Sequence, residues 1–136
     1  SGGRALKFYA HPQIWMANKG KIKKKVGKKN RTLGINTKVK VAKNRYTGVE
    51  SDTCIIPILW SVGIDDVGGC IDYLIEEGRI TGSGKKYICK DLGIEGNRDS
   101  LIQQAGEKYD KLQKLVGETY REIKAACSVE RPQRYE

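Results

Sequence analysis

Polar and hydrophobic residues alternate over much of the first sixty positions, which is the period of a strand with one buried face. The clearest case covers residues 36–43. There Val39 and Val41 fall on one face and lysines alternate with them on the other, so we predict a half-buried strand. Further extended segments are expected over residues 13–17, 21–26 and 54–60.

Turn-forming residues separate these segments. A short helix is expected over residues 4–10, and Pro12 should end it because proline pushes its predecessor out of the α region. Pro57 cannot donate a hydrogen bond to a ladder, so it indicates an edge position or a bulge in its strand. Turns are predicted at residues 18–20, 27–31 and 46–48.

The hydrophobic period changes to that of helices in the second half of the chain. The apolar spacing over residues 64–75 predicts a helix, and Gly78 is expected just beyond its C-terminus. The two aspartates near its start, Asp65 and Asp66, suit a helix N-terminus better than a catalytic pair. A short strand is expected over residues 86–90.

A longer apolar stripe repeats every three or four positions toward the C-terminus, and it predicts a continuous helix face. Gly106 is expected to break or kink that helix. Ser100 and Gln103 are a candidate capping box at its start, with Asn97 or Asp99 as alternative caps. The stripe consists of Leu101, Ala105, Tyr109, Leu112, Val116, Tyr120, Ile123 and Cys127.

These elements predict an α+β fold in which strands precede helices. The shift in composition and in period near residues 62–63 marks a candidate domain boundary. A chain of 136 residues fits one compact domain, or a small domain with part of another.

The net charge of +10 is distributed unevenly. Residues 1–50 contain fourteen Lys and Arg but one acid, Glu50, and so carry +13. Residues 51–136 carry −3. Such an asymmetry favours a polyanion partner for the N-terminal third. A merely solvated basic surface is the alternative.

Four widely spaced cysteines and a single histidine do not form a zinc-binding pattern, so we expect reduced thiols in an intracellular protein. No apolar run approaches the roughly 20 residues that span a bilayer, and we expect no secretory segment. His11 has no partner at a catalytic spacing. Trp15 and Trp60 are expected in the core rather than as platforms for stacked bases.

Two cations follow the strand predicted over residues 36–43. Lys43 extends its buried face, and Arg45 shares that side, roughly 7 Å away, if the chain stays extended. Such a pair suits a phosphate group, which Arg can grip with two hydrogen bonds. A solvated basic turn is the alternative. The glycine pair Gly2-Gly3 likewise allows a backbone to approach a phosphate closely.

Three segments resemble RecA-type recombinases. Residues 2–10, Gly-Gly-Arg-Ala-Leu-Lys-Phe-Tyr-Ala, resemble the end of the family's second DNA-binding loop. Residues 38–45, Lys-Val-Lys-Val-Ala-Lys-Asn-Arg, are similar to its Val-Lys-Val-Val-Lys-Asn-Lys segment. Residues 63–68, Gly-Ile-Asp-Asp-Val-Gly, resemble the opening of its small C-terminal domain. The chain is therefore expected to carry the C-terminal portion of such a protein.

The resemblance implies roles for individual residues. Lys43 and Arg45 match cations that reach across a filament interface to the γ-phosphate of ATP in the neighbouring subunit, although Arg45 stands where Lys is commoner. Lys7 is implied to lie near that nucleotide, and Phe8 to pack into the adjacent subunit. The residues implied to belong to the single-stranded DNA loop are Gly2, Gly3 and Arg4.

Further cations are candidate contacts to the DNA backbone, with a solubilising surface as the alternative for each group. The first group makes this hairpin more basic than that of bacterial family members. It consists of Lys21, Lys23, Lys24, Lys25, Lys28, Lys29 and Arg31. The second group, expected to help gather duplex DNA, consists of Lys85, Lys86, Lys90 and Arg98.

The resemblance also implies a division of the chain. Residues 1–62 would be the last strands of a RecA-like ATPase core, 63–129 a small helical α/β domain and 130–136 a frayed tail. No Gly-x-x-x-x-Gly-Lys-Ser/Thr loop and no strand ending in a Mg²⁺-binding Asp occur in the chain. The resemblance implies ATP and Mg²⁺ in the complete filament, whereas the missing motifs lead us to expect no cofactor, metal site or catalytic residue in the isolated chain.

The leading hypothesis is the C-terminal part of a cytoplasmic, ATP-dependent recombinase. It would form a helical homo-oligomeric filament on single-stranded DNA, pair it with duplex DNA, and serve DNA repair and the SOS response, without a membrane partner. The alternative is a self-contained basic nucleic-acid-binding module without motor activity.

Overall fold

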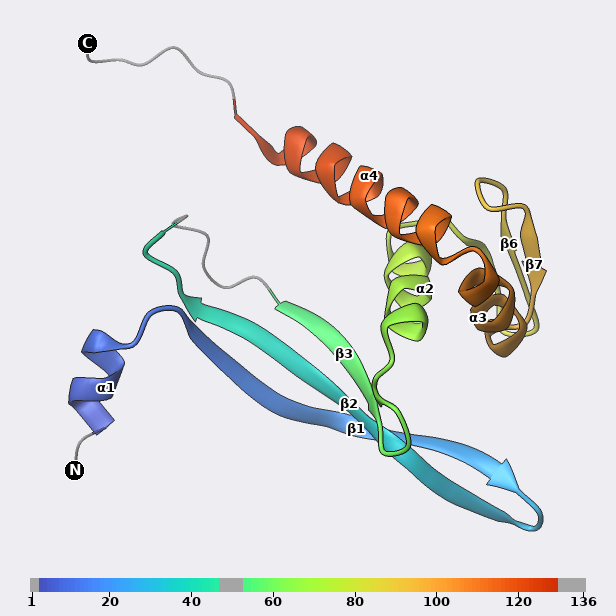
Figure 1. Ribbon diagram of the computed structural model, residues 1–136, viewed down its shortest axis with the longest axis horizontal. Helices are drawn as coiled ribbons and strands as arrows, with labels where there is room; N and C mark the ends of the chain where they lie inside the picture. Colours follow the sequence, from blue (N-terminus) through green and yellow to red (C-terminus); the bar gives the residue numbers. More distant parts are fainter. Residues whose placement is uncertain (1–2, 47–52, 130–136) are drawn as a thin grey trace. The chain divides into compact units, whose positions relative to one another are not determined.

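The computed structural model describes residues 3–46 and 53–129, and Figure 1 shows its helices and strands. Helices and strands are both abundant, so the expected α+β class is confirmed at that level. The chain divides into two compact units, residues 1–69 (unit 1) and 70–136 (unit 2). Each unit is described by itself.

The domain assignment implied by the resemblance stays a prediction. Its frayed tail over residues 130–136 lies outside the described residues, as does most of the turn expected at 46–48.

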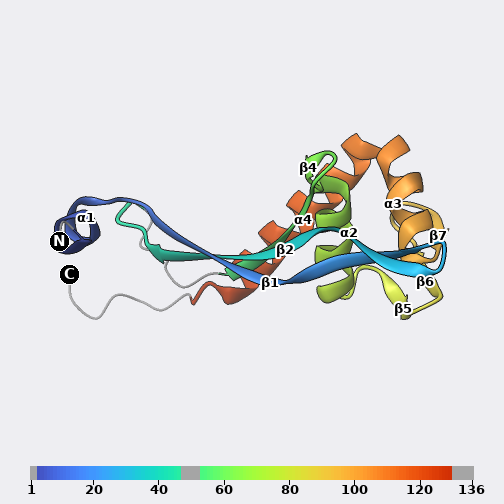
Figure 2. The ribbon, with the colours of Figure 1, turned by 90° about the horizontal axis from the view of Figure 1, so that it is seen from below.

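Unit 1 contains a four-stranded antiparallel sheet in the order β1-β2-β3-β4. The strands are β1 (Gln13–Val26), β2 (Lys29–Lys43), β3 (Thr53–Leu59) and β4 (Gly63–Ile64). Figure 2 shows this sheet nearly edge-on, as a single layer of strands. The predicted N-terminal helix is confirmed as α1 (Gly3–Tyr9), which precedes the sheet and buries none of its side chains.

The turn predicted at residues 18–20 is wrong, because β1 continues through it as one strand. The pairing of β1 with β2 shifts between Asn18 and Gly20, which is a bulge with Lys19 as the extra residue. The N–H of Gly20 donates to the side-chain oxygen of Asn18 at 2.9 Å. This local Asx bond satisfies the turn signal without reversing the chain.

The hairpin between β1 and β2 reverses at two residues only, Gly27 and Lys28. The predicted turn over 27–31 is therefore too long, since its last three residues already belong to β2 and pair with residues 24–26. Two-residue loops are the commonest hairpin connection. The half-buried strand predicted over 36–43 is confirmed within β2, where lysines are exposed between less exposed valines.

The strands β2 and β3 lie close together at Gly34, where an added Cβ atom would collide with the backbone oxygen of Ile58. Pro57 is buried, lies opposite Asn36 and precedes the residues of β3 that pair with β4. The short β4 leaves β3 close to being an edge strand, as the proline indicates. The carbonyl of Pro57 accepts a hydrogen bond from the N–H of Asp65 at 2.9 Å.

Large apolar side chains of unit 1 are exposed. Trp15 is 62% exposed and Trp60 is 69% exposed, so the core position expected for both tryptophans is wrong. Ile14 and Met16 on β1 are also more than half exposed. A single sheet without further layers cannot cover both of its faces, and the apolar pattern of β1 therefore produces no core within this unit.

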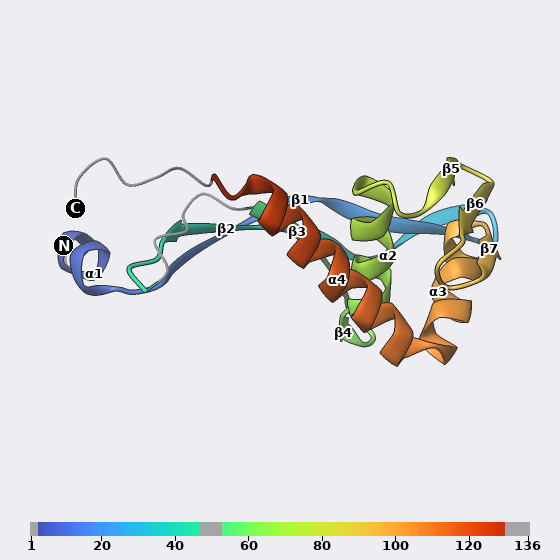
Figure 3. The same cartoon turned by 90° about the horizontal axis from the view of Figure 1, so that it is seen from above.

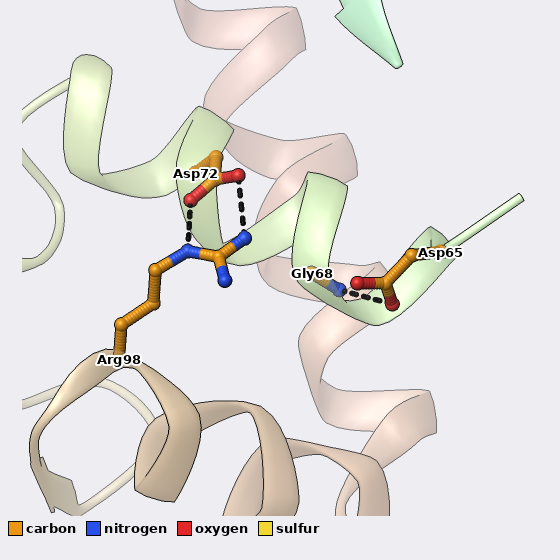
Figure 4. Close-up of polar contacts among 4 residues, drawn as sticks. All are labelled: Asp65, Gly68, Asp72 and Arg98. Carbon is orange, nitrogen blue, oxygen red and sulfur yellow. Dashed lines mark hydrogen bonds and ion pairs between the residues drawn. The ribbon is translucent and has the colours of Figure 1, made fainter. Parts of the chain in front are cut away.

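The helix predicted over residues 64–75 is α2 (Asp66–Glu76). Asp65 caps it, since its carboxylate accepts the N–H of Gly68 at 3.0 Å (Figure 4). Gly78 follows the helix with a positive φ of 77°, as expected for that position. Ile64 was wrongly assigned to the helix, because it lies in β4 and is 64% exposed.

Unit 2 has a three-stranded antiparallel sheet and two further helices. Its elements are β5 (Thr81–Ser83), β6 (Lys86–Cys89), β7 (Ile94–Gly96), α3 (Arg98–Glu107) and α4 (Tyr109–Cys127). Of the three strands, only β6 was predicted. The buried Ile, Leu, Ala and Cys side chains of the described residues all belong to this unit: Ile71, Leu74, Ile80, Cys89, Leu92, Ile94, Leu101, Ala105, Leu112 and Leu115.

The long helical stripe is interrupted at Lys108 (φ −117°, ψ 37°), where α3 ends and α4 begins (Figure 3). The interruption rotates the buried face of α4 onto Leu112, Leu115 and Thr119. The apolar face of the helix was expected to continue through Tyr120. This expectation is wrong, since the Tyr120 side chain is 54% exposed.

The break expected at Gly106 is present two residues later, at Lys108. The N-cap of α3 is Asn97, one of the alternatives, whose side chain accepts the N–H of Ser100 at 2.8 Å. The capping box of Ser100 is wrong, because its hydroxyl oxygen instead accepts a hydrogen bond from the amide of Gln104 at 2.8 Å.

Gly34→Ala should destabilise the sheet of unit 1, because its methyl group would collide with the Ile58 carbonyl and force the two strands apart. We expect a cost of about 1–3 kcal/mol, as for other overpacked sites. The fluorescence of Trp15 and Trp60, both in unit 1, reports this unfolding transition during denaturant titration.

The matched control for Gly34→Ala is Gly106→Ala, where an added Cβ atom meets nothing within 4 Å. Gly106→Ala should leave the midpoint of the unfolding transition, followed by tryptophan fluorescence, unchanged. An unchanged transition for Gly34→Ala would contradict the close approach of β2 and β3.

Candidate functional site

Two segments far apart in the sequence meet in unit 1, namely the end of α1 and the end of β2. The ammonium group of Lys43, the last residue of β2, donates to the carbonyl oxygens of Lys7 and Phe8, each at 3.1 Å. The guanidinium group of Arg45 donates to the same Phe8 oxygen, also at 3.1 Å. Two cations thus converge on one carbonyl group.

This convergence follows from the electrostatics of a helix end. The last carbonyl groups of a helix have no partner within it, and they carry the negative end of its dipole. Lysine and arginine side chains are suitable partners for them. Because α1 buries no side chain, such backbone contacts are its main polar attachment to the sheet, together with a hydrogen bond from the side chain of Gln13 to the Lys7 carbonyl.

His11 belongs to the same cluster, although no partner at a catalytic spacing was found for it in the sequence. Its Nδ1 atom accepts the backbone N–H of Arg45 at 3.0 Å, so the ring proton of the neutral imidazole is assigned to Nε2. The imidazole also lies against the ring of Tyr46, with 4.3 Å between centroids. We refer to Lys7, Phe8, His11, Lys43 and Arg45 together as the α1–β2 junction.

The cations of the junction keep hydrogen-bonding capacity beyond the helix carbonyls. An ammonium group has three donors and a guanidinium group five, which is more than these carbonyl contacts use. The ion pairs between described residues join Arg79 to Glu122 and Arg98 to Asp72, and neither includes Lys43 or Arg45. The arrangement therefore suits an anion with several oxygens, such as a phosphate group.

A groove borders the junction. It is lined by Arg4, Lys7, Phe8, Gln13, Ala42 and Lys43. The side chain of Phe8 is 69% exposed beside it, which is unusual for the single phenylalanine of a chain. An exposed aromatic ring next to two cations marks this end of the sheet as a candidate contact surface.

The structure also places the other predicted residues. Gly3 and Arg4 form the first turn of α1 and are exposed, whereas Gly2 lies outside the described residues. The seven basic hairpin residues are exposed. Six of them lie at the tip of β1 and β2, beyond β3 in the pairing register, whereas Lys21 lies opposite Ile35, which pairs with β3.

In unit 2, Lys85, Lys86 and Lys90 are exposed around β6. Arg98 differs from them, because its guanidinium group makes two hydrogen bonds to Asp72, at 2.7 and 2.8 Å, which tie α3 to α2 (Figure 4). The geometry therefore gives Arg98 a structural partner that the sequence pattern did not reveal.

Other kinds of site receive no support from the described residues. Within 3–46 and 53–129, no three His, Cys, Asp or Glu side chains gather as a metal site would require. Among the described residues, the four cysteines form no disulfide with one another. No described helix is both long and apolar enough to cross a membrane.

Comparison with curated proteins identifies relatives of this chain. It is 30% identical to Protein RecA of Chlamydia muridarum over 128 residues, which are 94% of this chain and 35% of that protein. Protein RecA of Malacoplasma penetrans is 29% identical over 119 residues, 85% of this chain and 35% of that protein. Protein RecA of Lactococcus lactis subsp. cremoris is 33% identical over 93 residues, 68% of this chain and 24% of that protein.

The chain is similar to the C-terminal portion of RecA. The resemblance seen in its short motifs is therefore confirmed. The chain spans about a third of the length of the first two RecA relatives. No protein-family model matches the chain.

Lys43→Met should loosen α1, because its last carbonyl groups lose a cation. A cation at a helix C-terminus contributes about 0.3–1 kcal/mol, so amide hydrogens of α1 should exchange roughly two- to fivefold faster. Lys40→Met is the matched control, since Lys40 is an exposed lysine of the same strand and should leave this exchange rate unchanged. Equal rates in the two variants would show that Lys43 does not hold the helix.

Proposed function

We propose that this chain is the C-terminal part of a RecA-like, ATP-dependent recombinase that forms a helical filament and pairs single-stranded DNA with homologous duplex. Such a protein would act in the cytoplasm, in recombination, repair and the SOS response. The similarity to RecA over 94% of the chain supports the proposal. The observation that carries it furthest is the α1–β2 junction.

The junction suits a nucleotide held by a neighbouring subunit. Lys43 and Arg45 would meet the terminal phosphate, with Lys7 on the adjoining helix near the same group. Both cations already point to one atom, the Phe8 oxygen, so little side-chain freedom remains to be lost when an anion binds. ATP with Mg²⁺ would supply the phosphoryl group, and the residues of this chain would supply positive charge at its edge.

The same contacts would link nucleotide to DNA. Gly3 and Arg4, from the segment that resembles the DNA-binding loop, form the first turn of α1, and the end of α1 accepts hydrogen bonds from both cations. Phe8 would pack into the adjacent subunit through its exposed ring while its carbonyl holds Lys43 and Arg45. A structural change at the loop residues, at the two cations or at the Phe8 ring would thus reach the other two through one turn of α1.

The two halves of the chain would have different duties. The strands of residues 1–62 would complete an ATPase core, which agrees with the exposed apolar side chains of β1 that need a covering layer. Residues 63–129 would form a small domain that helps gather duplex DNA, with Lys85, Lys86 and Lys90 as contacts. Arg98 is a weaker candidate, because Asp72 already pairs with it.

The second candidate is a self-contained basic nucleic-acid-binding module without motor activity. The +13 charge of residues 1–50 favours it as much as it favours the first proposal. The two proposals differ in what they require of Lys43 and Arg45. A recombinase needs both side chains to face a nucleotide, whereas a simple binding module would need them only for their contribution to its net positive charge.

Lys43→Ala in the complete recombinase polypeptide should abolish DNA-stimulated ATP hydrolysis, because a cation at the transferred phosphate is lost. We expect a fall of about 10²–10³-fold, the size of effect seen when a single stabilising donor is removed. Circular dichroism should change little, because the substitution leaves the fold of the chain in place. Lys111→Ala, an exposed lysine on α4, is the control.

Normal hydrolysis by the Lys43→Ala protein would refute the interface role. The isolated 136-residue chain should hydrolyse no ATP with or without DNA, because it lacks a phosphate-binding loop. Turnover by the isolated chain would contradict the proposal that another segment provides the nucleotide site.

A further inference from the structure

The hairpin formed by β1 and β2 continues beyond the rest of the sheet (Figure 1). The pairing of β2 with β3 stops at Gly34 and Leu59, whereas β1 and β2 pair with each other down to Val26 and Lys29. We call residues 19–33 the basic ribbon. Residues 23–33 are its two-stranded end beyond β3, whereas residues 20–22 lie opposite residues of β2 that still pair with β3. The side chains of the ribbon are exposed except for Ile22 and Thr32, which are half-buried.

The basic ribbon has an unusual composition for a solvated surface. It contains eight Lys or Arg among fifteen residues and no acid. Surfaces that serve only solubility mix both signs of charge. No ion pair between described residues includes a cation of the ribbon. The ribbon therefore carries a concentrated positive charge that no carboxylate of the described chain offsets.

The register of the ribbon makes this charge costly. Lys24 lies directly opposite Arg31, and like charges at such positions destabilise a strand pair. Lys23 and Lys25 fall on the other face, because successive side chains alternate. Cations on both faces of a two-stranded ribbon suit a polyanion that surrounds it, and not one that lies flat against a single side.

The residue types of the ribbon distinguish between kinds of nucleic acid. Binding of single strands relies on aromatic side chains on which bases stack, and residues 19–33 contain none. The major groove of B-form DNA is wide enough for a two-stranded ribbon and has a phosphate backbone along each side. Lysines contact phosphates without reading the sequence of bases.

We propose that the basic ribbon is a duplex DNA-binding arm that lies in the major groove and contacts the phosphates of both backbones without sequence preference. This inference rests on the DNA-binding part of the proposed function and names the class of DNA that this surface takes. It does not depend on ATP. The junction at the opposite end of the same strands has different geometry, since its cations are held on helix carbonyls.

The test is fluorescence anisotropy of the full 136-residue chain with a blunt 20-base-pair DNA duplex, the same sequence as an RNA duplex, and a 20-nucleotide oligothymidine. The triple variant Lys23→Gln/Lys24→Gln/Lys25→Gln removes three ribbon charges. The matched control, Lys111→Gln/Lys114→Gln/Lys124→Gln, removes three exposed charges from α4. Lys23→Arg/Lys24→Arg/Lys25→Arg keeps the charge of the ribbon.

We expect the ribbon variant to bind the DNA duplex at least tenfold more weakly at 50 mM salt. The slope of log K against log salt should fall by about 2.7, or 0.9 for each lost phosphate contact. The α4 control and the arginine variant should keep the affinity for the DNA duplex and the salt slope close to those of the parent chain. The RNA duplex should bind more weakly, because its major groove is too narrow and deep for the ribbon.

An equal loss of affinity for the DNA duplex in the ribbon variant and the α4 control would overturn the proposal. An unchanged affinity of the ribbon variant would also overturn it. A larger loss for oligothymidine than for the duplex would assign the ribbon to single strands instead. Equal affinity for the RNA and DNA duplexes would overturn the groove position. A parent chain that binds no DNA overturns the ribbon proposal, while the nucleotide role of Lys43 is judged separately by hydrolysis.

Discussion

The hydrogen bonds from Lys43 and Arg45 to the Phe8 carbonyl are the contacts on which the chemistry of unit 1 depends. Because α1 buries no side chain, these bonds and those to the Lys7 carbonyl hold the helix against the strands. They also fix where the two cations lie. One carbonyl group therefore determines both the position of α1 and the geometry that would be available to a phosphate.

Unit 1 uses its positive charge in two ways at the two ends of one strand pair. At the junction, the cations have defined partners and a defined position, which suits recognition of a single anionic group. On the basic ribbon, exposed lysines repel one another across the register, which suits a long polyanion. Under the two proposals, the two ends would therefore bind different partners.

Local pattern predicted the elements well, and long-range contacts explain where it failed. The strand over residues 36–43 and the aspartates at the start of α2 depend on neighbouring residues, so their patterns were sufficient, although Asp65 caps the helix instead of lying within it. Trp15 was placed in a core because alternation cannot tell how many layers cover a sheet. Strand parity predicted a shared side for Lys43 and Arg45 only if the chain stayed extended, but β2 ends at Lys43 and Arg45 lies in a turn. Their convergence and the contact of His11 depend instead on segments over thirty residues apart.

The central claim is that an anion at Lys43 and Arg45 is sensed at Phe8. Phe8 is the single phenylalanine of the chain, so incorporation of 4-fluorophenylalanine gives one ¹⁹F resonance. Titration with inorganic tripolyphosphate should shift this resonance saturably, and the shift should be lost in Lys43→Met/Arg45→Met. An unmoved resonance, or the same shift in the double variant, would contradict the account.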